Sequence, residues 1–124
     1  MNIADAGTFI QNECHNAAYN AGWWHDKNGV TILNNPYTVS NKLMLIVSEI
    51  AEAMEADRKN LMDEKLPHRK GLEVELADAV IRIGDLAGAL GLDLGGAIKE
   101  KMEYNAVRPD HKKENRNAVN GKSY

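Results

Sequence analysis

Residues 48–52 read Ser-Glu-Ile-Ala-Glu, and residues 75–78 read Glu-Leu-Ala-Asp. Each stretch carries two carboxylates three positions apart inside a run that is otherwise apolar, and residues three apart on a helix share a face. Like charges beside an apolar surface are unfavourable unless something compensates them. A hard divalent cation such as Mg²⁺ does so, because it prefers carboxylate oxygens and commonly binds phosphates as well.

A second interpretation treats each acidic pair as part of a solvated helix face, since Glu is a common surface residue of helices. Taken alone, either pair fits that interpretation better. Two such pairs on consecutive long helices favour a metal site instead. Its expected ligands are Glu49, Glu52, Glu75 and Asp78.

Length and composition limit the classes of protein to which the chain can belong. Its 124 residues suffice for one domain, and 44% hydrophobic with 27% charged residues is ordinary for a soluble globular protein. A formal net charge of −3 argues against a broad surface for nucleic acid or for an anionic membrane, so we expect neither as a partner. The single cysteine, Cys14, cannot form an internal disulfide. With no export signal or long apolar run visible, we expect a cytoplasmic protein.

Apolar residues recur at helical spacing in four segments, and no strand alternation is visible, so we predict an all-α four-helix bundle. Ser40 or Asn41 is the expected N-cap of the second helix, and Asp93 that of the fourth. Because the chain has one Phe, apolar helix faces left over are expected to pack against a copy of the chain. We expect a domain over residues 1–109, a polar tail over 110–124, and helices at about 6–21, 41–60, 72–90 and 94–107.

Two groups of residues outside the acidic pairs are candidates for ligand binding. Trp23 and Trp24 follow the first helix, where one is expected in the core and the other is free to stack on a nucleobase. Lys101, Asn105 and Arg108 lie within a narrow stripe of the fourth helix, which suits a phosphate group. Basic residues in a last helical turn also complement the helix dipole, so this pattern alone is weak.

Two basic residues lie on the helix faces that carry the acids. Lys42, two turns before Glu49, is either a phosphate ligand or a solvated lysine near a helix start. Arg82 shares a polar face with Asp78 and Asp85, and we expect it to pair with one of them.

In this order the motifs resemble the MazG-like superfamily of all-α nucleoside triphosphate pyrophosphohydrolases. The family pattern E-E-x-x-E followed by E-x-x-D matches residues 48–52 and 75–78, except that Ser48 replaces the first Glu. Residues 101–109, KMEYNAVRP, resemble the K-x-x-x-N-x-x-R ending of the family. Residues 41–43, NKL, resemble the start of the same helix in the dCTP-pyrophosphatase-like branch. The resemblance covers residues 41–109.

The resemblance implies a homodimer or homotetramer that uses Mg²⁺, or Mn²⁺, to cleave a nucleoside triphosphate to the monophosphate and pyrophosphate. A deoxynucleoside triphosphate is the expected substrate, although the motifs do not fix the base. The site residues that the resemblance and the patterns above imply are, for the metal and for catalysis, Glu49, Glu52, Glu75 and Asp78; for the phosphates, Lys101, Asn105 and Arg108; and for the base, Trp23, Trp24 and Asn41.

Other functions remain open from the sequence. A non-catalytic helical oligomer that binds a nucleotide or a metal ion is one, with Ser48 as the mark of a lost ligand. A helical interaction module without a ligand is another, but it leaves unexplained why acids interrupt the apolar runs. Among enzymes, a further alternative is phosphoribosyl-ATP pyrophosphohydrolase, whose fold resembles that of the same superfamily.

Overall fold

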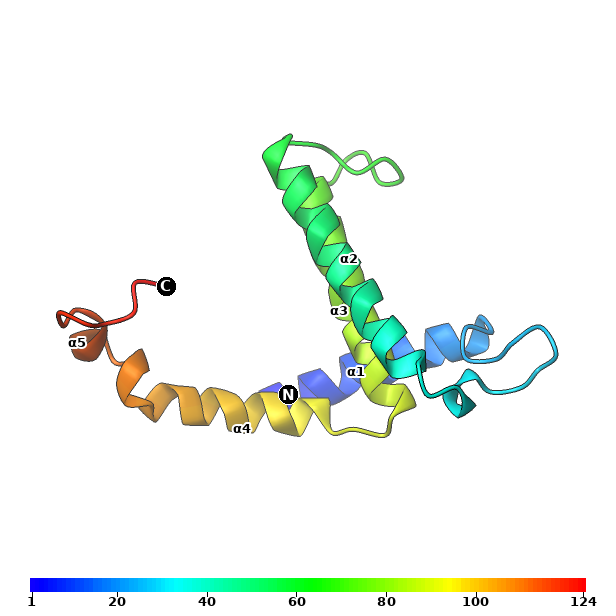
Figure 1. The fold of residues 1–124 in the computed structure, drawn as a ribbon, viewed down its shortest axis with the longest axis horizontal. Helices are drawn as coiled ribbons and strands as arrows, with labels where there is room; N and C mark the ends of the chain where they lie inside the picture. Colours follow the sequence, from blue (N-terminus) through cyan, green and yellow to red (C-terminus); the bar gives the residue numbers. More distant parts are fainter. The chain divides into compact units, whose positions relative to one another are not determined.

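The computed structural model describes all 124 residues, and it is all-helical (Figure 1). The prediction of an all-α fold is confirmed: no strand forms, and the only β-type contacts are two isolated bridges, His25 with Thr31 and Met62 with Lys70. The short helix α5 was not expected. In chain order the elements are α1 (Ile3–Asn20), η1 (Ile32–Asn34), α2 (Thr38–Arg58), α3 (Gly71–Ala89), α4 (Leu94–Val107), η2 (Pro109–His111) and α5 (Lys113–Arg116).

The chain divides into two compact units. One unit is Phe9–Leu92, and it holds α2, α3 and most of α1. The other joins Met1–Thr8 to Asp93–Tyr124, and it holds the start of α1 together with α4, η2 and α5. The division that the sequence suggested, at residue 109, stays a prediction.

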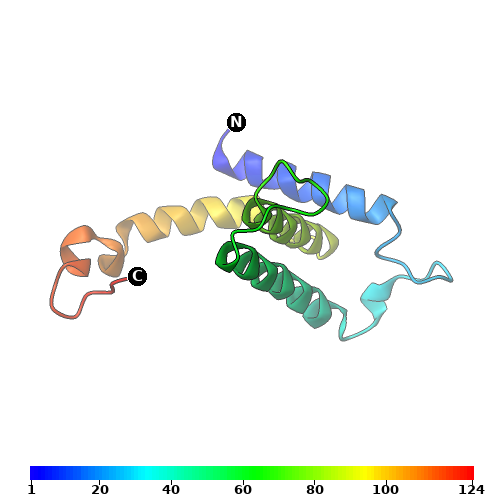
Figure 2. The same ribbon diagram turned by 90° about the horizontal axis from the view of Figure 1, so that it is seen from above.

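Helices α2 and α3 lie side by side in the first unit, and Figure 2 shows them adjacent and nearly parallel in axis. Three alanines of these two helices, Ala53, Ala56 and Ala79, are buried. At the first residue of α3, a Cβ added to Gly71 would lie 3.0 Å from the Cβ of Ala56. A glycine and alanines therefore let the two backbones approach closely, which brings the acidic faces of both helices together.

The loop between α2 and α3 is held by its own hydrogen bonds. The side chain of Asp63 accepts hydrogen bonds from the backbone N–H groups of Lys65, at 3.0 Å, and of Leu66, at 2.7 Å. The backbone N–H of Asp63 donates to the carbonyl of Arg69 at 2.9 Å. These bonds fold the loop back on itself beside the ends of α2 and α3.

The start of α2 differs from the prediction. The helix begins at Thr38, about one turn before the expected position, and no side chain caps it. Instead, the hydroxyl of Thr38 donates to the carbonyl of Ile32 at 2.6 Å, and that of Ser40 donates to Tyr37 at 3.0 Å. Ser40 and Asn41 lie inside the first turn of α2, whose N-cap position is held by Tyr37, so neither is the N-cap.

In the second unit the structure agrees more closely with the prediction from the sequence. Helix α4 has the predicted bounds, and the side chain of Asp93 caps it by accepting from the N–H of Gly96 at 3.0 Å. A Cβ added to Gly7 would lie 2.6 Å from the Cα of Gly95, so glycines allow close contact between the start of α1 and the start of α4.

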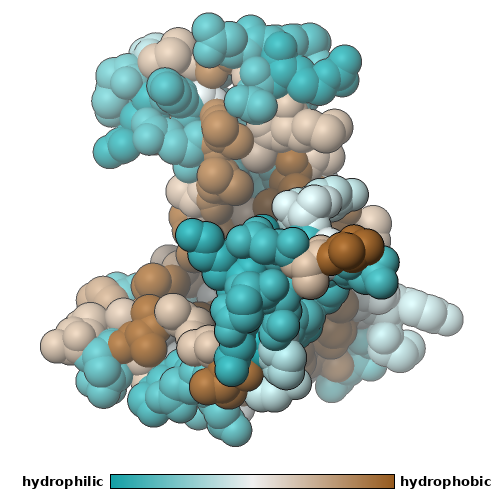
Figure 3. Space-filling model, turned by 90° about the vertical axis from the view of Figure 1, so that its left-hand side faces the viewer, coloured by the Kyte–Doolittle hydropathy of each residue, from teal (hydrophilic) through white to brown (hydrophobic).

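The protein buries few large side chains. Its buried hydrophobic residues are Trp24, Leu86 and alanines, and no large side chain is fully buried. Large apolar residues of α2 and α3 remain exposed instead, among them Val47 at 53% and Val80 at 49%. Figure 3 shows hydrophobic side chains among hydrophilic ones on the surface. No helix combines the length and the apolar character that crossing a membrane requires.

Candidate metal centre

Three carboxylates from two helices converge at one place in the first unit. Glu49 and Glu52 project from one face of α2, and Glu75 projects from α3. One oxygen of each carboxylate lies within 4.8 Å of one oxygen of the other two. Glu49 is only 9% exposed, Glu75 is half-buried and Glu52 is exposed. The three side chains could therefore hold a metal ion.

Glu75 is the member of the cluster that has a buried carboxylate oxygen without a hydrogen-bond donor. Its Oε2 is buried and no donor lies within hydrogen-bonding distance. Burial, followed by the neighbouring Glu49 and Glu52, raises the pKa of Glu75 from 4.5 to about 7. A carboxyl group in this state gains from a cation, which replaces the proton and satisfies the free oxygen. Three carboxylates form a hard oxygen donor set, and the residues therefore fit an ion of the Mg²⁺ or Mn²⁺ kind.

Asp78 lies about one turn beyond Glu75 on α3. Burial and then the charge of Glu49 raise its pKa, while the guanidinium of Arg82 opposes the shift. Asp78 lines the same cavity as the three glutamates but does not belong to the group whose oxygens converge. Its role as a fourth ligand stays a prediction.

Two cavities meet at this cluster. The first, the acidic cavity, has a volume of about 650 Å³ and lies between α2, α3 and the loop that joins them. Its walls carry seven acidic side chains against one lysine, so a cation would be strongly attracted there. The acidic residues are Glu49, Glu52, Glu55, Asp63, Glu64, Glu75 and Asp78.

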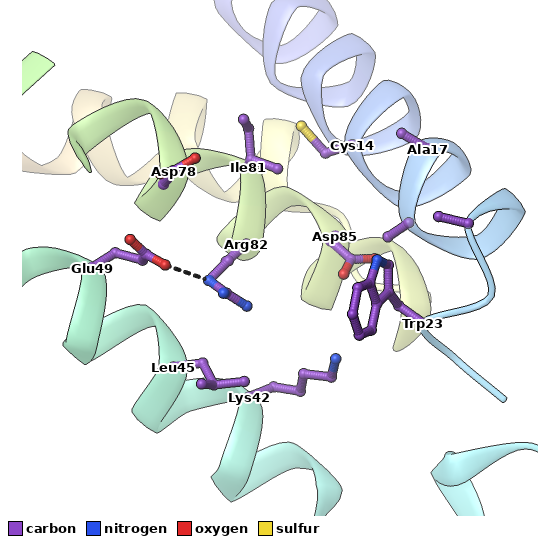
Figure 4. Close-up of a pocket in the computed structure, with 12 residues that line it drawn as sticks. Cys14, Ala17, Trp23, Lys42, Leu45, Glu49, Asp78, Ile81, Arg82 and Asp85 are labelled. Atoms are coloured by element: carbon purple, nitrogen blue, oxygen red, sulfur yellow. Dashed lines mark hydrogen bonds and ion pairs between the residues drawn. The ribbon is translucent and has the colours of Figure 1, made fainter. Parts of the chain in front are cut away.

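The second, the mixed cavity, has a volume of about 630 Å³ and shares Glu49 and Asp78 with the acidic cavity (Figure 4). Helix α1, the segment after it, α2 and α3 all contribute to its walls. Its other charged residues are Lys42, Arg82 and Asp85, and its aromatic residue is Trp23. This cavity therefore combines cations, an aromatic ring and a carboxylate next to the candidate metal ligands.

Arg82 joins the two helices at the boundary of the cavities. Its Nε donates a hydrogen bond to Oε1 of Glu49 at 2.9 Å (Figure 4). The partners expected from the sequence, Asp78 and Asp85, are on the same helix as Arg82, whereas the actual partner is on α2. The close approach of α2 and α3 places Glu49 within reach, which helical spacing alone does not reveal.

The two adjacent tryptophans have different surroundings. Trp24 is 2% exposed, its indole N–H donates to Oδ1 of Asp85 at 2.7 Å, and the Nζ of Lys42 lies 4.7 Å from its ring centre. Trp24 is therefore a core side chain whose ring is not available to a nucleobase. Trp23 is 69% exposed and lines the mixed cavity. Asn41, the third candidate for the base, is exposed and lines neither cavity.

The candidate phosphate ligands of α4 belong to the second unit, where they have local contacts. Arg108 donates two hydrogen bonds to Asp110, at 2.9 Å and 2.6 Å, and the Nζ of Lys101 lies 4.7 Å from the ring centre of Tyr104. Arg108 also lowers the pKa of Asp110. Oδ1 of Asn105 is buried without a hydrogen-bond partner. Phosphate binding by Lys101, Asn105 and Arg108 stays a prediction.

Sequence reasoning missed the place of Asp85 in the site. Asp85 follows Asp78 by seven residues and Arg82 by three, so its position on the polar face of α3 was visible in the sequence. Its contacts with Trp24 and His15 depend on how α1 and the following segment pack on α3. No local pattern carries that information.

Comparison of the chain with protein-family models, with curated proteins and with solved structures finds no match. The resemblance to MazG-like enzymes therefore rests on the sequence motifs, and the function has to be argued from the geometry of the site.

Proposed function

We propose that the protein is a Mg²⁺-dependent hydrolase that cleaves a nucleoside triphosphate, in particular a deoxynucleoside triphosphate, to the monophosphate and pyrophosphate. The observation that carries the proposal is the convergence of the carboxylates of Glu49, Glu52 and Glu75 within 4.8 Å. Phosphoryl transfer requires charge neutralisation and alignment more than covalent catalysis by the protein. A cluster of acids that can hold Mg²⁺, next to a cavity with cations and an exposed indole, supplies both.

The acids have separate parts in the proposal. Glu49, Glu52 and Glu75, with Asp78 as the fourth acid, would hold Mg²⁺, which when bound neutralises phosphate charge and lowers the pKa of water. Because Arg82 already donates to Oε1 of Glu49, this oxygen is engaged in the absence of an ion. Glu75, with a pKa of about 7 in the metal-free protein, has to release its proton before it binds the ion, so ion binding should weaken as the pH falls below neutrality.

The mixed cavity would accommodate the rest of the nucleotide. Arg82, which lines it and contacts Glu49, would balance the charge of the phosphates, while the exposed ring of Trp23 offers a stacking surface for the base. Since Glu49 and Asp78 belong to both cavities, a nucleotide in the mixed cavity has its phosphates beside the acids. This continuity favours a nucleotide over a free metal ion as the ligand of the complete site.

The proposal includes a MazG-like bundle, formed by a homodimer or homotetramer, and the cytoplasm as its location. The exposed apolar residues of α2 and α3 support self-association, because they leave a hydrophobic face without a partner in one chain. The free thiol of Cys14 fits a reducing compartment.

A panel assay tests the hydrolase. The protein is incubated with Mg²⁺ and each of the common ribonucleoside and deoxynucleoside triphosphates, and pyrophosphate and monophosphate are measured. We expect both products in equal amounts from at least one substrate, and none in the presence of excess EDTA. Glu52→Gln and Asp78→Asn should each lower turnover by about a hundredfold or more, because each removes a negative charge beside the ion. Glu100→Gln, at an exposed position on α4, is the matched control.

The same assay separates the alternatives. Stabilisation by nucleotide and Mg²⁺ without products would support a binding protein rather than an enzyme. If no nucleotide is cleaved and neither Mg²⁺ nor nucleotide shifts the melting temperature, the protein is a helical interaction module and the proposal is wrong.

A further inference from the structure

Asp85 is a nearly buried carboxylate whose position in α3 directs it into the mixed cavity. Its side chain is only 13% exposed. The indole N–H of Trp24 donates to Oδ1 at 2.7 Å, and Nδ1 of His15 lies 3.0 Å from the same oxygen. Because an ionised carboxylate only accepts, Nδ1 of His15 carries the hydrogen. Two donors from α1 and the segment after it therefore fix the orientation of Asp85.

Both hydrogen bonds end on Oδ1, and no donor reaches Oδ2. Neither Lys42 nor Arg82 forms an ion pair with Asp85, although both line the same cavity. Oδ2 is thus an acceptor that the fold orients, that receives no hydrogen bond from the protein and that belongs to a side chain lining the mixed cavity.

The surroundings of Oδ2 suit a flat ring. Figure 4 shows Asp85, Trp23 and Lys42 around one end of the cavity, with Glu49 and Asp78 around the other. An exposed indole can stack on a nucleobase, and the acids at the other end belong to the candidate metal centre. A nucleotide with its phosphates near the acids would therefore have its base near Asp85.

We infer that Oδ2 of Asp85 accepts a hydrogen bond from the exocyclic amino group of a nucleobase and so selects cytosine or adenine. This inference rests on the proposed function, since it concerns the base of the same substrate. Both bases present an amino group beside an unprotonated ring nitrogen, N4 beside N3 in cytosine and N6 beside N1 in adenine. The amino group matches Oδ2, and Lys42 is a donor on the same cavity wall for the ring nitrogen.

The other bases fit this carboxylate less well. Uracil and thymine have a ring N–H flanked by two carbonyl oxygens, which the negative charge of Asp85 repels. Guanine presents two neighbouring donors, N1–H and the 2-amino group, which require two acceptor oxygens. Only one oxygen is free, because Trp24 and His15 already occupy Oδ1.

Binding of non-hydrolysable analogues tests the inference separately from the hydrolase. The affinities of the α,β-imido analogues of dCTP, dATP, dTTP, dUTP and dGTP are measured by isothermal titration calorimetry with Mg²⁺ present. We expect the dCTP or the dATP analogue to bind about tenfold more tightly than those of dTTP, dUTP and dGTP, as a hydrogen bond to a charged group implies. Equal affinities, or a preference for a carbonyl base or for guanine, would overturn the inference.

Asp85→Asn is a sharper test, because the structure predicts in which direction the order of affinities among the analogues should change. The indole N–H of Trp24 can only donate, so the amide oxygen has to stay at the position of Oδ1. The NH₂ group then replaces Oδ2, and a donor replaces an acceptor. We expect the preference to move towards the thymine and uracil analogues, whose O4 accepts. An unchanged ranking would contradict the inference, and Asp57→Asn, at an exposed position outside both cavities, is the control.

Should Asp85→Asn fail to fold, the order of affinities measured for the unmodified protein still tests the inference by itself. Trp23→Ala should weaken binding of every analogue by a similar factor, since stacking is common to all bases. If the analogues bind with the expected ranking but natural triphosphates yield no pyrophosphate, the proposed hydrolase is wrong and the base selection stands. If no analogue binds, both are wrong.

Discussion

Nε of Arg82 on α3 donates a hydrogen bond to Oε1 of Glu49 on α2, at 2.9 Å, where the acidic cavity meets the mixed cavity. Glu49 is thus the member of the acidic cluster whose charge is already balanced by the protein, whereas Oε2 of Glu75 has no partner. The cluster thus contains one carboxylate paired with an arginine, Glu49, and another that favours its protonated form, Glu75. This division determines how metal, nucleotide and pH should act on the protein.

Replacing Arg82 should affect metal and nucleotide in opposite directions. Arg82→Gln removes a cation that competes for Glu49, so Mg²⁺ alone should bind more tightly, by a factor of about ten. The same change removes positive charge from the mixed cavity, so the Michaelis constant for the nucleotide should rise by about tenfold. Calorimetric titration with Mg²⁺ and steady-state kinetics measure the two effects. Arg69→Gln is the control, since Arg69 is exposed and pairs with Glu73 outside the cluster; weaker Mg²⁺ binding in Arg82→Gln would contradict competition.

The metal-free protein should lose stability as the pH rises towards neutrality. The pKa of Glu75 is 4.5 as a reference and about 7 in the fold, so between these values the folded protein binds the proton more tightly than the unfolded chain. Its contribution to the free energy of unfolding is therefore full below about pH 4.5, declines up to about pH 7 and is lost above it. Asp78, whose pKa is also raised, acts in the same direction.

Thermal unfolding in EDTA at several pH values between about 5 and 8 measures this decline. Between these pH values the free energy of unfolding should fall by roughly 1–3 kcal/mol in the unmodified protein, after allowance for partial solvent exposure, and Glu75→Gln should remove this fall. The variant should therefore be more stable than the unmodified protein at about pH 8. Mg²⁺ should stabilise the unmodified protein at that pH and leave the variant nearly unchanged. The same pH slope in both proteins would show that Glu75 does not titrate as described.

The two tryptophans should differ in their contribution to stability. Trp24→Phe removes the donor to Asp85 and leaves space around a side chain that is 2% exposed, so we expect a loss of about 2–4 kcal/mol in the free energy of unfolding. Trp23→Phe changes a side chain that is 69% exposed and should cost less than about 0.5 kcal/mol. Urea denaturation monitored by circular dichroism compares the pair. Equal losses would mean that Trp23 is also buried, for instance by a second chain.

Self-association should depend on the apolar face of α2. Val47 is 53% exposed, and Val47→Glu places a charge on that face without removing a buried contact. We expect the variant to dissociate to monomers at concentrations where the unmodified protein is a dimer or tetramer, because burying an unpaired charge in an interface is costly. Sedimentation equilibrium measures the association state. Val119→Glu makes the same change at a fully exposed position and should have no effect; a monomeric unmodified protein would make the proposed assembly wrong.

The sequence by itself determined the helices and the identity of the acids. Apolar spacing located α2, α3 and α4, and the approximate bounds predicted for α4 agree with the structure because Asp93 caps it and Pro109 follows it. The spacing of Glu49 with Glu52, and of Glu75 with Asp78, indicated which faces carry the carboxylates. Both results follow from interactions between residues within a turn or two of one another, which a local pattern contains.

Only the tertiary structure decided how these faces meet. It brought Glu75 to Glu49 and Glu52, paired Arg82 with Glu49 rather than with an acid of its own helix, and left Trp23 exposed while it buried Trp24. It also gave Asp85 its two donors from a distant part of the chain. Small residues permit the close approach of these helices, Gly71 and Ala56 between α2 and α3, and Gly88 where α3 meets His15 of α1. The rotation and separation of packed helices arise from side chains far apart in the sequence, so no short stretch encodes them.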